Sequence, residues 1–395
     1  MNKPLNIVVN RNTPKAIEVF SRLGHVVALS SQEITKKSLK NADILIVRSE
    51  TRVDRKLLEG TPVRFVGTLT IGTDHVDLGY LDSKGIVFAS APGSNSTSVA
   101  EYMAAALCVL SAHTGEPLNG KTIGIVGVGN VGSKIVGVAR AFGMEVLLND
   151  PPVARTTGDA SYRSLDGLMG AEIITLHVPL THDGPDATYH LFDEARINRM
   201  KAGAVLINTS RGGVVETEAL YQALLSKHVS ATILDVWENE PEISPQLLHE
   251  VLLATPHIAG YSLDGKLNAV RMVHESLCRY LNRPFDWDAT PVFDAIEETK
   301  ICIPPSSLRV NEIVSSAVRQ AYDIELDDRL LRNILSLKER GRGQYFMQLR
   351  AEYRIRREFH NLTVELARSQ AAASQILGEL GFKISVKKEE PHRRD

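Results

Sequence analysis

The sequence predicts an α/β protein with two doubly wound parallel sheets, the second of Rossmann type and the first flavodoxin-like, and a small C-terminal α/β domain. Two series of short apolar runs alternate with polar segments that suit helices, as in a parallel sheet buried on both faces. A glycine-rich turn stands near the start of the second series. With 395 residues, the chain is too long for one hydrophobic core, so several domains are expected.

The first series of apolar runs lies between residues 6 and 90. Runs about twenty residues apart indicate βαβ units. We expect strands at NIVVN (6–10), VVALS (26–30), ILIVR (44–48), RFVGTLT (64–70) and IVFAS (86–90). The later segment VAEYMAAALCVLSAH is rich in Ala, Leu and Met and follows Ser and Thr residues that suit an N-cap, so it is predicted to be a helix.

The second series begins at residue 122. Helical segments separate its runs, which is the pattern of a doubly wound dinucleotide-binding domain. A helix over about 262–281 follows, and we expect it to return the chain to the N-terminal domain. The predicted strands are TIGIVGV, EVLLND, EIITLHV, AVLINTS, ATILDVW and VLLATP.

The last part of the chain is predicted to be a small separate α/β domain. The stretch ICIPPSS is expected to be a linker, and helical segments at 309–322 and 329–338 follow it, with strand-like FHNLTVEL and FKISV. We expect a substrate-binding (lid) domain, a dinucleotide-binding domain and a C-terminal domain. Their predicted boundaries are 1–97 with 262–288, 98–261 and 289–395.

Composition excludes several classes of protein. The formal net charge is −2, with no excess of either sign, so neither a nucleic-acid nor a membrane partner is expected. The cysteines, Cys108, Cys278 and Cys302, are too far apart for a disulfide framework or a Cys-x-x-Cys site. The N-terminal residues show no apolar signal segment and no later run is long enough to span a bilayer, so we expect a cytoplasmic protein.

Three features receive a structural interpretation. His75 lies in TDHVD between two aspartates, but adjacent ligands on one short segment favour a turn over a metal site. His177 lies in an apolar run and is expected to pack. The segment 332–358 has eight Lys or Arg residues and three Glu, and no nucleic-acid module accompanies it. A solvated or interface helix face is therefore expected there.

The dinucleotide motif lies in GIVGVGNVGSKI. Gly127, Gly129 and Gly132 have the Gly-x-Gly-x-x-Gly spacing, follow a predicted strand and open a helix. The first permits a tight turn, the second lets the backbone approach a pyrophosphate, and the third lets helix and strand pack closely. Asp150 ends the next strand, where its carboxylate would bond the adenosine ribose and repel a 2′-phosphate. NAD is therefore favoured over NADP.

Three ionisable residues follow successive strands of the second series. Arg211 follows AVLINTS, Glu240 follows ATILDVW, and His257 follows VLLATP. The carboxyl ends of parallel strands share one edge, which forms the ligand crevice of open α/β sheets, so these side chains should converge beside the cofactor. An imidazole takes the hydroxyl proton as hydride leaves, a carboxylate fixes its tautomer, and a guanidinium grips a substrate carboxylate.

These motifs resemble those of the D-isomer-specific 2-hydroxyacid dehydrogenases over essentially the whole chain. The resemblance is carried by NTSRGGVV, LDVWENEP, TPHIAG, FVGTLTIGTDHVD, APGSNSTSVAEY, IVGVGNVG, LLNDPP and HIAGYSLDGK. The last five of these motifs resemble, more narrowly, a subfamily that acts in vitamin B6 biosynthesis. They imply NAD-dependent oxidation of 4-phospho-D-erythronate and a C-terminal domain that forms a homodimer. The family resemblance also implies Arg211 and Glu240 as active-site residues and His257 as the proton donor or acceptor.

The resemblance further implies contacts to cofactor and substrate. Val178 stands where the family commonly has threonine, so only its backbone remains to contact the cofactor. Arg48, at a strand end, is either a ligand of the substrate phosphate or a rim arginine. The implied NAD contacts are the glycine turn with Asn130 and Val131, and Asp150, Val178, Asp235 and Gly260. The implied substrate contacts are Ser49, Thr70 and Tyr261.

Two alternatives stay open. In the first, the chain is a dehydrogenase of another D-2-hydroxy acid, such as a phosphoglycerate or glycerate. In the second, the chain is an NAD-sensing binding protein on the same fold. The intact set of Arg211, Glu240 and His257 argues against the sensor, but related binding proteins can retain all three residues. Turnover of a 2-hydroxy acid is therefore the observation that separates enzyme from sensor.

Overall fold

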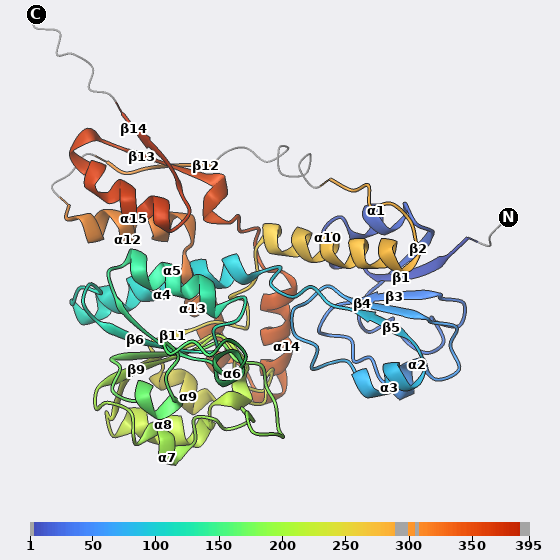
Figure 1. The fold of residues 1–395 in the computed structure, drawn as a ribbon, viewed down its shortest axis with the longest axis horizontal. Coiled ribbons are helices and arrows are strands. Elements are labelled where there is room, and N and C mark those ends of the chain that lie inside the picture. Colours follow the sequence, from blue (N-terminus) through green and yellow to red (C-terminus); the bar gives the residue numbers. More distant parts are fainter. Residues whose placement is uncertain (1–3, 289–298, 305–307, 388–395) are drawn as a thin grey trace, which may run out of the picture. The chain divides into compact units, whose positions relative to one another are not determined.

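The computed structural model describes residues 4–288, 299–304 and 308–387 (Figure 1). The chain forms two compact units. The first consists of Met1–Asn95 with Tyr261–Glu297, and the second of Ser96–Gly260 with Glu298–Asp395. The C-terminal residues therefore share a compact unit with the dinucleotide-binding sheet.

The first unit is built on a five-stranded parallel sheet of order β2-β1-β3-β4-β5. The chain winds from β1 to β2 on one side and then returns to β3 on the other, so the switch point lies between β1 and β3. The strands are β1 (Asn6–Asn10), β2 (His25–Leu29), β3 (Ile44–Val47), β4 (Phe65–Thr68) and β5 (Val87–Ala89). The helices are α1 (Ala16–Phe20), α2 (Arg55–Leu58), α3 (Leu78–Ser83) and α10 (Leu263–Tyr280).

Both faces of this sheet are buried, as the continuous apolar runs predict. Ile44 and Ile46 of β3 pack in one core with α1 and α10, while Leu45 and Val47 pack in the other with α2 and α3. A Cβ on Gly67 of β4 would lie 2.5 Å from a side-chain carbon of α10, so this glycine allows the close packing of that helix. The helix predicted to return the chain to the N-terminal sheet is thus confirmed as α10.

The second unit contains a six-stranded parallel sheet of order β11-β10-β9-β8-β6-β7. A single bridge between Leu148 and Tyr162 lies beyond β7, and the chain then crosses to β8 on the other side of β6. This is the doubly wound dinucleotide-binding arrangement, with its switch point between β6 and β8. The strands are β6 (Thr122–Val126), β7 (Glu145–Asn149), β8 (Ile173–Leu176), β9 (Ala204–Asn208), β10 (Val229–Leu234) and β11 (Leu253–Ala254).

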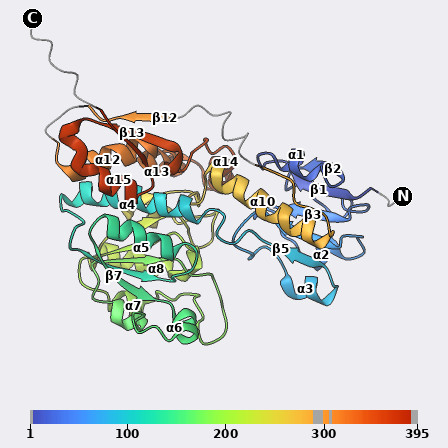
Figure 2. The ribbon, with the colours of Figure 1, turned by 45° about the horizontal axis from the view of Figure 1, so that its top comes forward.

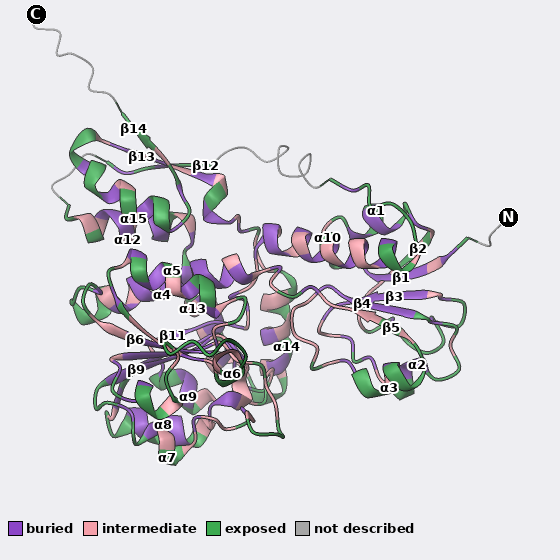
Figure 3. Cartoon of the chain, viewed as in Figure 1, coloured by how far each residue is buried: buried purple, intermediate pink, exposed green. Residues whose placement is uncertain are grey.

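Helices cover both faces of this sheet, which is purple with buried residues in Figure 3. Among the described helices, none combines the length and the apolar character needed to cross a membrane. The α-helices are α4 (Ser96–Thr114), α5 (Gly132–Ala141), α6 (Pro151–Thr157), α7 (Glu194–Ile197), α8 (Thr217–Leu225) and α9 (Pro245–Glu250). Short 3₁₀ turns occur at Leu165–Leu168 and Gly212–Val214.

The C-terminal part of this unit adds a three-stranded parallel sheet of order β12-β13-β14. Its helix α12 lies beside α4 in both ribbon views (Figure 1 and Figure 2). The strands are β12 (Thr299–Cys302), β13 (Leu362–Leu366) and β14 (Lys383–Val386). The α-helices are α12 (Val310–Ala321), α13 (Ile324–Arg332), α14 (Glu339–Ala351) and α15 (Ser374–Glu379). Further 3₁₀ turns occur at Asn333–Ser336, Phe359–Asn361 and Arg368–Ala373.

One prediction for this region was wrong in part, and another had the wrong starting residue. Ile301 and Cys302 of the predicted linker lie in β12, because β13, far away in sequence, supplies a pairing partner that local composition does not reveal. Residues 305–307 of the same stretch lie outside the described residues. The helix expected over 329–338 begins earlier, as α13, where the Asp323 side chain accepts the Leu326 N–H as an N-cap.

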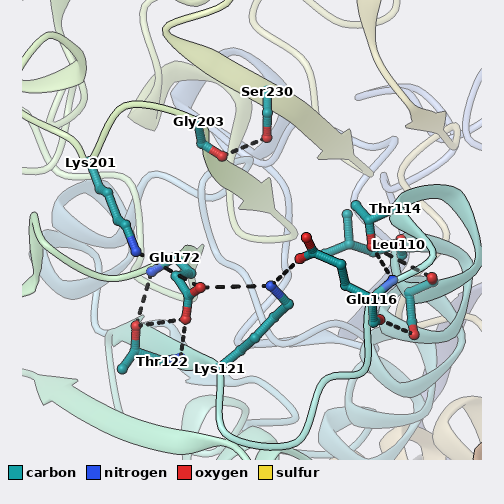
Figure 4. Close-up of polar contacts among 10 residues, drawn as sticks. Leu110, Thr114, Glu116, Lys121, Thr122, Glu172, Lys201, Gly203 and Ser230 are labelled. Carbon is teal, nitrogen blue, oxygen red and sulfur yellow. Dashed lines mark hydrogen bonds and ion pairs between the residues drawn. The ribbon is translucent and has the colours of Figure 1, made fainter.

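The amino edge of the six-stranded sheet is held by a polar cluster (Figure 4). The Glu172 carboxylate accepts the Thr122 N–H at 3.0 Å, and it lies 3.6 Å from Lys121 and 3.8 Å from Lys201. The Thr122 hydrogen bond, assisted by the two ammonium charges, holds the pKa of the Glu172 carboxyl below its usual range. This edge lies at the strand ends opposite the glycine turn, and its contacts stabilise the sheet.

Candidate active site

The glycine-rich turn joins β6 to α5 at the switch point of the six-stranded sheet. Gly127 has a φ of 86°, and a Cβ there would lie 2.7 Å from the His177 carbonyl oxygen. A Cβ on Gly132 would lie 2.0 Å from the Gly127 carbonyl oxygen, so neither position accepts a side chain. Around Gly129, a Cβ would meet no described atom within 4 Å.

The start of α5 suits an anionic ligand. Its N-cap, Val131, makes no side-chain cap to the first N–H groups of the helix, and Asn130 beside it is exposed. Open space at Gly129 and the positive end of the helix dipole together fit a diphosphate group. These residues therefore fit the dinucleotide that the spacing predicts.

Asp150 and Val178 both lie against this turn. The Asp150 carboxylate accepts the Val128 N–H at 2.8 Å and, as the N-cap of α6, the Val153 N–H at 3.1 Å. A Val178 side-chain carbon is 2.9 Å from the position of a Cβ on Gly127. Both predicted cofactor contacts are thus adjacent to the glycine motif, although their roles toward NAD stay predictions.

His257 and Glu240 lie together beyond the carboxyl ends of β11 and β10. The His257 Nδ1 is hydrogen-bonded to a Glu240 carboxylate oxygen, and the other carboxylate oxygen accepts the Trp237 N–H at 3.2 Å. The two side chains are 28% and 24% exposed, so the imidazole has access to solvent. His257 adopts a left-handed backbone conformation, with a φ of 56°, which is uncommon for a non-glycine residue and frequent at functional sites.

The electrostatic surroundings keep Glu240 ionised. Burial alone would raise the pKa of its carboxyl group. The charge of His257, the hydrogen bond to its ring, the charge of Arg350 and the Trp237 N–H together outweigh burial, so the pKa lies below its usual value. Because an ionised carboxylate accepts hydrogen bonds and does not donate them, the proton between the two side chains belongs to the His257 Nδ1.

Asp235 fixes the loop that carries His257. Its carboxylate is 1% exposed and accepts hydrogen bonds from the Thr255 hydroxyl (2.6 Å), the Ile258 N–H (2.7 Å) and the Ala259 N–H (2.9 Å). Its carbonyl oxygen accepts the His257 N–H at 2.7 Å. The family resemblance assigned Asp235 to cofactor binding, together with Gly260, which follows Ala259. It did not reveal that Asp235 anchors the loop.

Arg211 lies in a turn that packs on the segment before Glu240. A Cβ on Gly212 would lie 1.9 Å from the Trp237 carbonyl carbon, so the two backbones are in direct contact. The Arg211 guanidinium donates to the Ser210 carbonyl at 2.8 Å. The double glycine in SRGG could have indicated this close backbone contact, but the sequence analysis did not identify it.

His177 packs as expected, at the end of β8. Its ring nitrogens are within hydrogen-bonding distance of the Thr175 hydroxyl (2.8 Å) and the Thr209 hydroxyl (3.1 Å). Burial lowers its pKa to about 3, so the imidazole is neutral.

In the first unit, Arg48 and Tyr261 form a polar cluster at the switch point between β1 and β3. Arg48 is 9% exposed and donates to the Tyr261 hydroxyl at 3.1 Å and to the Asn12 carbonyl at 3.3 Å. Glu50 lies 3.5 Å from the same guanidinium. The Lys266 ammonium lies 4.9 Å from the centre of the Tyr261 ring. Sequence reasoning did not assign Lys266, although it ends the quoted motif HIAGYSLDGK.

Ser49 and Thr70 follow β3 and β4 of the same sheet. The Thr70 hydroxyl lies 2.7 Å from the Thr68 hydroxyl and donates to the Gly72 carbonyl at 2.9 Å. The His75 Nε2 lies 2.9 Å from the Thr68 hydroxyl, so this histidine supports the Thr70 turn. Among the described residues, no three His, Cys, Asp or Glu side chains gather as potential metal ligands.

Comparison with protein-family models gives two matches. Residues 99–259 match the model described as "D-isomer specific 2-hydroxyacid dehydrogenase, NAD binding domain". Residues 305–381 match a model described as "Domain of unknown function (DUF3410)".

Known proteins resemble nearly the whole chain. A relative named "Erythronate-4-phosphate dehydrogenase" from Salinibacter ruber is 44% identical, with 97% of this chain and 99% of the relative covered. One of the same name from Chromohalobacter salexigens is 42% identical, with the same shares covered. The solved structure of an NAD-dependent formate dehydrogenase from Staphylococcus aureus in complex with NAD has a TM-score of 0.60 and 27% identity. It covers 71% of this chain and 97% of its own.

The contact at Gly212 predicts an asymmetry between two neighbouring glycines. Gly212→Ala should lower the thermal unfolding midpoint by several degrees, because overpacking against a backbone costs about 1–3 kcal/mol. Gly213→Ala is the matched control, since a Cβ there would first meet side-chain carbons at 3.5 Å. Calorimetry of both variants tests this contact, and equal midpoints would contradict it.

Proposed function

The chain belongs to the D-isomer-specific 2-hydroxyacid dehydrogenases, and we propose that it uses NAD to oxidise 4-phospho-D-erythronate to (R)-3-hydroxy-2-oxo-4-phosphooxybutanoate. This reaction is a step in the biosynthesis of pyridoxine and pyridoxal 5′-phosphate, the vitamin B6 compounds. The observation that carries the proposal is the hydrogen bond between His257 and an ionised Glu240 at the sheet edge that also bears the glycine turn. The relatives named erythronate-4-phosphate dehydrogenase support the choice of substrate.

His257 is the general base in the direction of oxidation. With its Nδ1 proton directed at Glu240, the imidazole has its lone pair on Nε2, where it accepts the proton of the substrate C2 hydroxyl. Glu240 fixes this tautomer and stabilises the imidazolium that forms. When bound, NAD supplies the hydride acceptor.

Two arginines neutralise the two anionic ends of the substrate. Arg211 holds the carboxylate, for which the planar guanidinium fork is well suited. Arg48 holds the phosphate, supported by its burial and its bond to Tyr261. Ser49 and Thr70 supply further hydrogen bonds to the substrate.

The cofactor is held by the second unit. The glycine turn with its exposed Asn130 receives the diphosphate, and Asp150 beside it bonds the ribose and disfavours the 2′-phosphate of NADP. The proposed cofactor contacts are Gly127, Gly129, Asn130, Val131, Gly132, Asp150, Val178, Asp235 and Gly260.

We further propose that the chain acts in the cytoplasm as a homodimer, and that 1–97 with 262–288, 98–261 and 289–395 are its three domains. Dimerisation is assigned to the last of these because of the family resemblance. No nucleic-acid or membrane partner is part of this proposal.

A binding protein that senses NAD is the alternative from another class. It would bind NAD and turn over no 2-hydroxy acid. A panel containing 4-phosphoerythronate, phosphoglycerate and glycerate, followed by NADH absorbance, separates the sensor from the enzyme and identifies the preferred substrate.

His257→Ala should reduce kcat roughly 10²–10⁴-fold, because it removes the general base. NAD binding, measured by calorimetry, should stay nearly unchanged. His249→Ala, on the exposed end of α9, is the control and should keep wild-type turnover. A parallel loss of NAD affinity and turnover in His257→Ala would instead assign a structural role to this histidine.

Arg48→Ala should raise the KM for 4-phosphoerythronate by about tenfold or more, since it removes a charge-assisted bond to phosphate. The KM for unphosphorylated erythronate should change much less. Arg52→Ala is the control, because the Arg52 side chain is 80% exposed. If the KM values for both substrates rise equally, or if neither KM changes, Arg48 does not bind the phosphate.

A further inference from the structure

Helix α14 lies against the loop that carries Glu240. A Cβ built on Gly343 of α14 would lie 3.4 Å from Pro241 Cγ and 2.2 Å from a Glu242 carboxylate oxygen. One turn further, Phe346 is fully buried in the same hydrophobic cluster as Trp237. The helix and the loop from Trp237 to Glu242 therefore pack as one structure, although they are far apart in the sequence.

Arg350 lies on the face of α14 that meets this loop. Residues seven apart share a helix face, so Arg350 stands two turns beyond Gly343 in the same direction. It is partly buried. Burial raises the pKa of the Glu240 carboxyl group, and the charge of Arg350 lowers it, less strongly than the charge and the hydrogen bond of His257 do. The helix thus carries a positive charge that acts on the Glu240 carboxylate.

The segment before α14 is fixed to the C-terminal end of α9 and to the edge strand β11, the strand that leads to His257. Arg332 of α13 donates to the Leu248 carbonyl at 2.7 Å and to the Val251 carbonyl at 2.8 Å. Asp328, paired with Arg332 at 2.8 Å, accepts the Ala254 N–H at 2.8 Å. These bonds satisfy carbonyl groups at the end of α9 and one N–H of the edge strand, and they hold the C-terminal segment in place.

The segment after α14 is fixed to the end of the loop that carries His257. Arg356 is 4% exposed and donates to the Ala259 carbonyl at 2.9 Å and to the Ser98 carbonyl at 3.2 Å. Its guanidinium lies 4.2 Å from the centre of the Tyr322 ring. Contacts on both sides of α14 therefore leave the helix little freedom to move away from Glu240.

We propose that α14 is a positioning element for the catalytic pair and that Arg350 is the charged residue through which it acts on Glu240. This inference rests on the proposed function, because it takes His257 and Glu240 as the catalytic pair. It assigns to the region that the family model of unknown function matches a role in the chain's own active site, separate from dimerisation.

Within the part of the chain that the structure describes, His257 and Arg350 are charged groups that lower the pKa of Glu240, and Glu238 and Glu242 are its acidic neighbours in the sequence of the same loop. The Glu238 carboxylate is hydrogen-bonded to a histidine ring and a backbone N–H, and the Glu242 carboxylate lies at α14. Loss of the Arg350 charge removes a cation that opposes protonation of the His257–Glu240 pair, so the pair takes up a proton at higher pH.

Arg350→Met should move the acidic limb of the pH profile of kcat/KM to higher pH, by roughly 0.5 unit. Arg350→Lys keeps a positive charge and should restore most of the wild-type profile. Arg340→Met, at an exposed arginine of the same helix, is the matched control and should leave the limb in place. Thermal unfolding and sedimentation of each variant report any change in stability or oligomeric state.

An acidic limb that stays in place in Arg350→Met, or that moves equally in Arg350→Lys, overturns the inference, whatever happens to stability. A limb that moves only in Arg350→Met supports it. The proposed function fails separately, if His257→Ala retains turnover.

Discussion

The candidate active site depends on how the loop from Thr255 to Ala259 leaves strand β11. The buried Asp235 carboxylate accepts bonds from Thr255, Ile258 and Ala259, and it holds His257 in a left-handed conformation between them. A loop with this backbone strain persists only where its surroundings determine it. The buried Asp235 carboxylate thus fixes the loop from which the imidazole meets Glu240.

In each of the two large sheets, the candidate site residues lie at the switch point or at the carboxyl ends of the strands. In the first unit these are Arg48 and Tyr261, and in the second the glycine turn, Glu240 and His257. The opposite, amino edge of the second sheet carries ion pairs that hold strands together (Figure 4). The same parallel architecture thus separates the residues of the site from residues that stabilise the fold.

The strands of both large sheets and the meeting of Glu240 with His257 follow from the sequence. Buried parallel strands read as continuous apolar runs, and residues after successive strands reach one edge whatever their separation in sequence. The strand β12 was missed because its partner lies far along the chain and prolines follow it. The basic segment 332–358 was expected to be a solvated or interface face, yet it contains Phe346, which is fully buried. No local pattern connects Arg350 with Glu240, since their proximity arises only from tertiary packing.

The tautomer of His257 tests the central claim most directly. Nitrogen NMR of the ¹⁵N-histidine-labelled protein, at a pH where the imidazole is neutral, distinguishes a proton on Nδ1 from one on Nε2. The geometry predicts the proton on Nδ1 in the wild type and loss of this preference in Glu240→Ala. A neutral His257 with its proton on Nε2 would show that Glu240 does not orient the base, and it would contradict this account of the site.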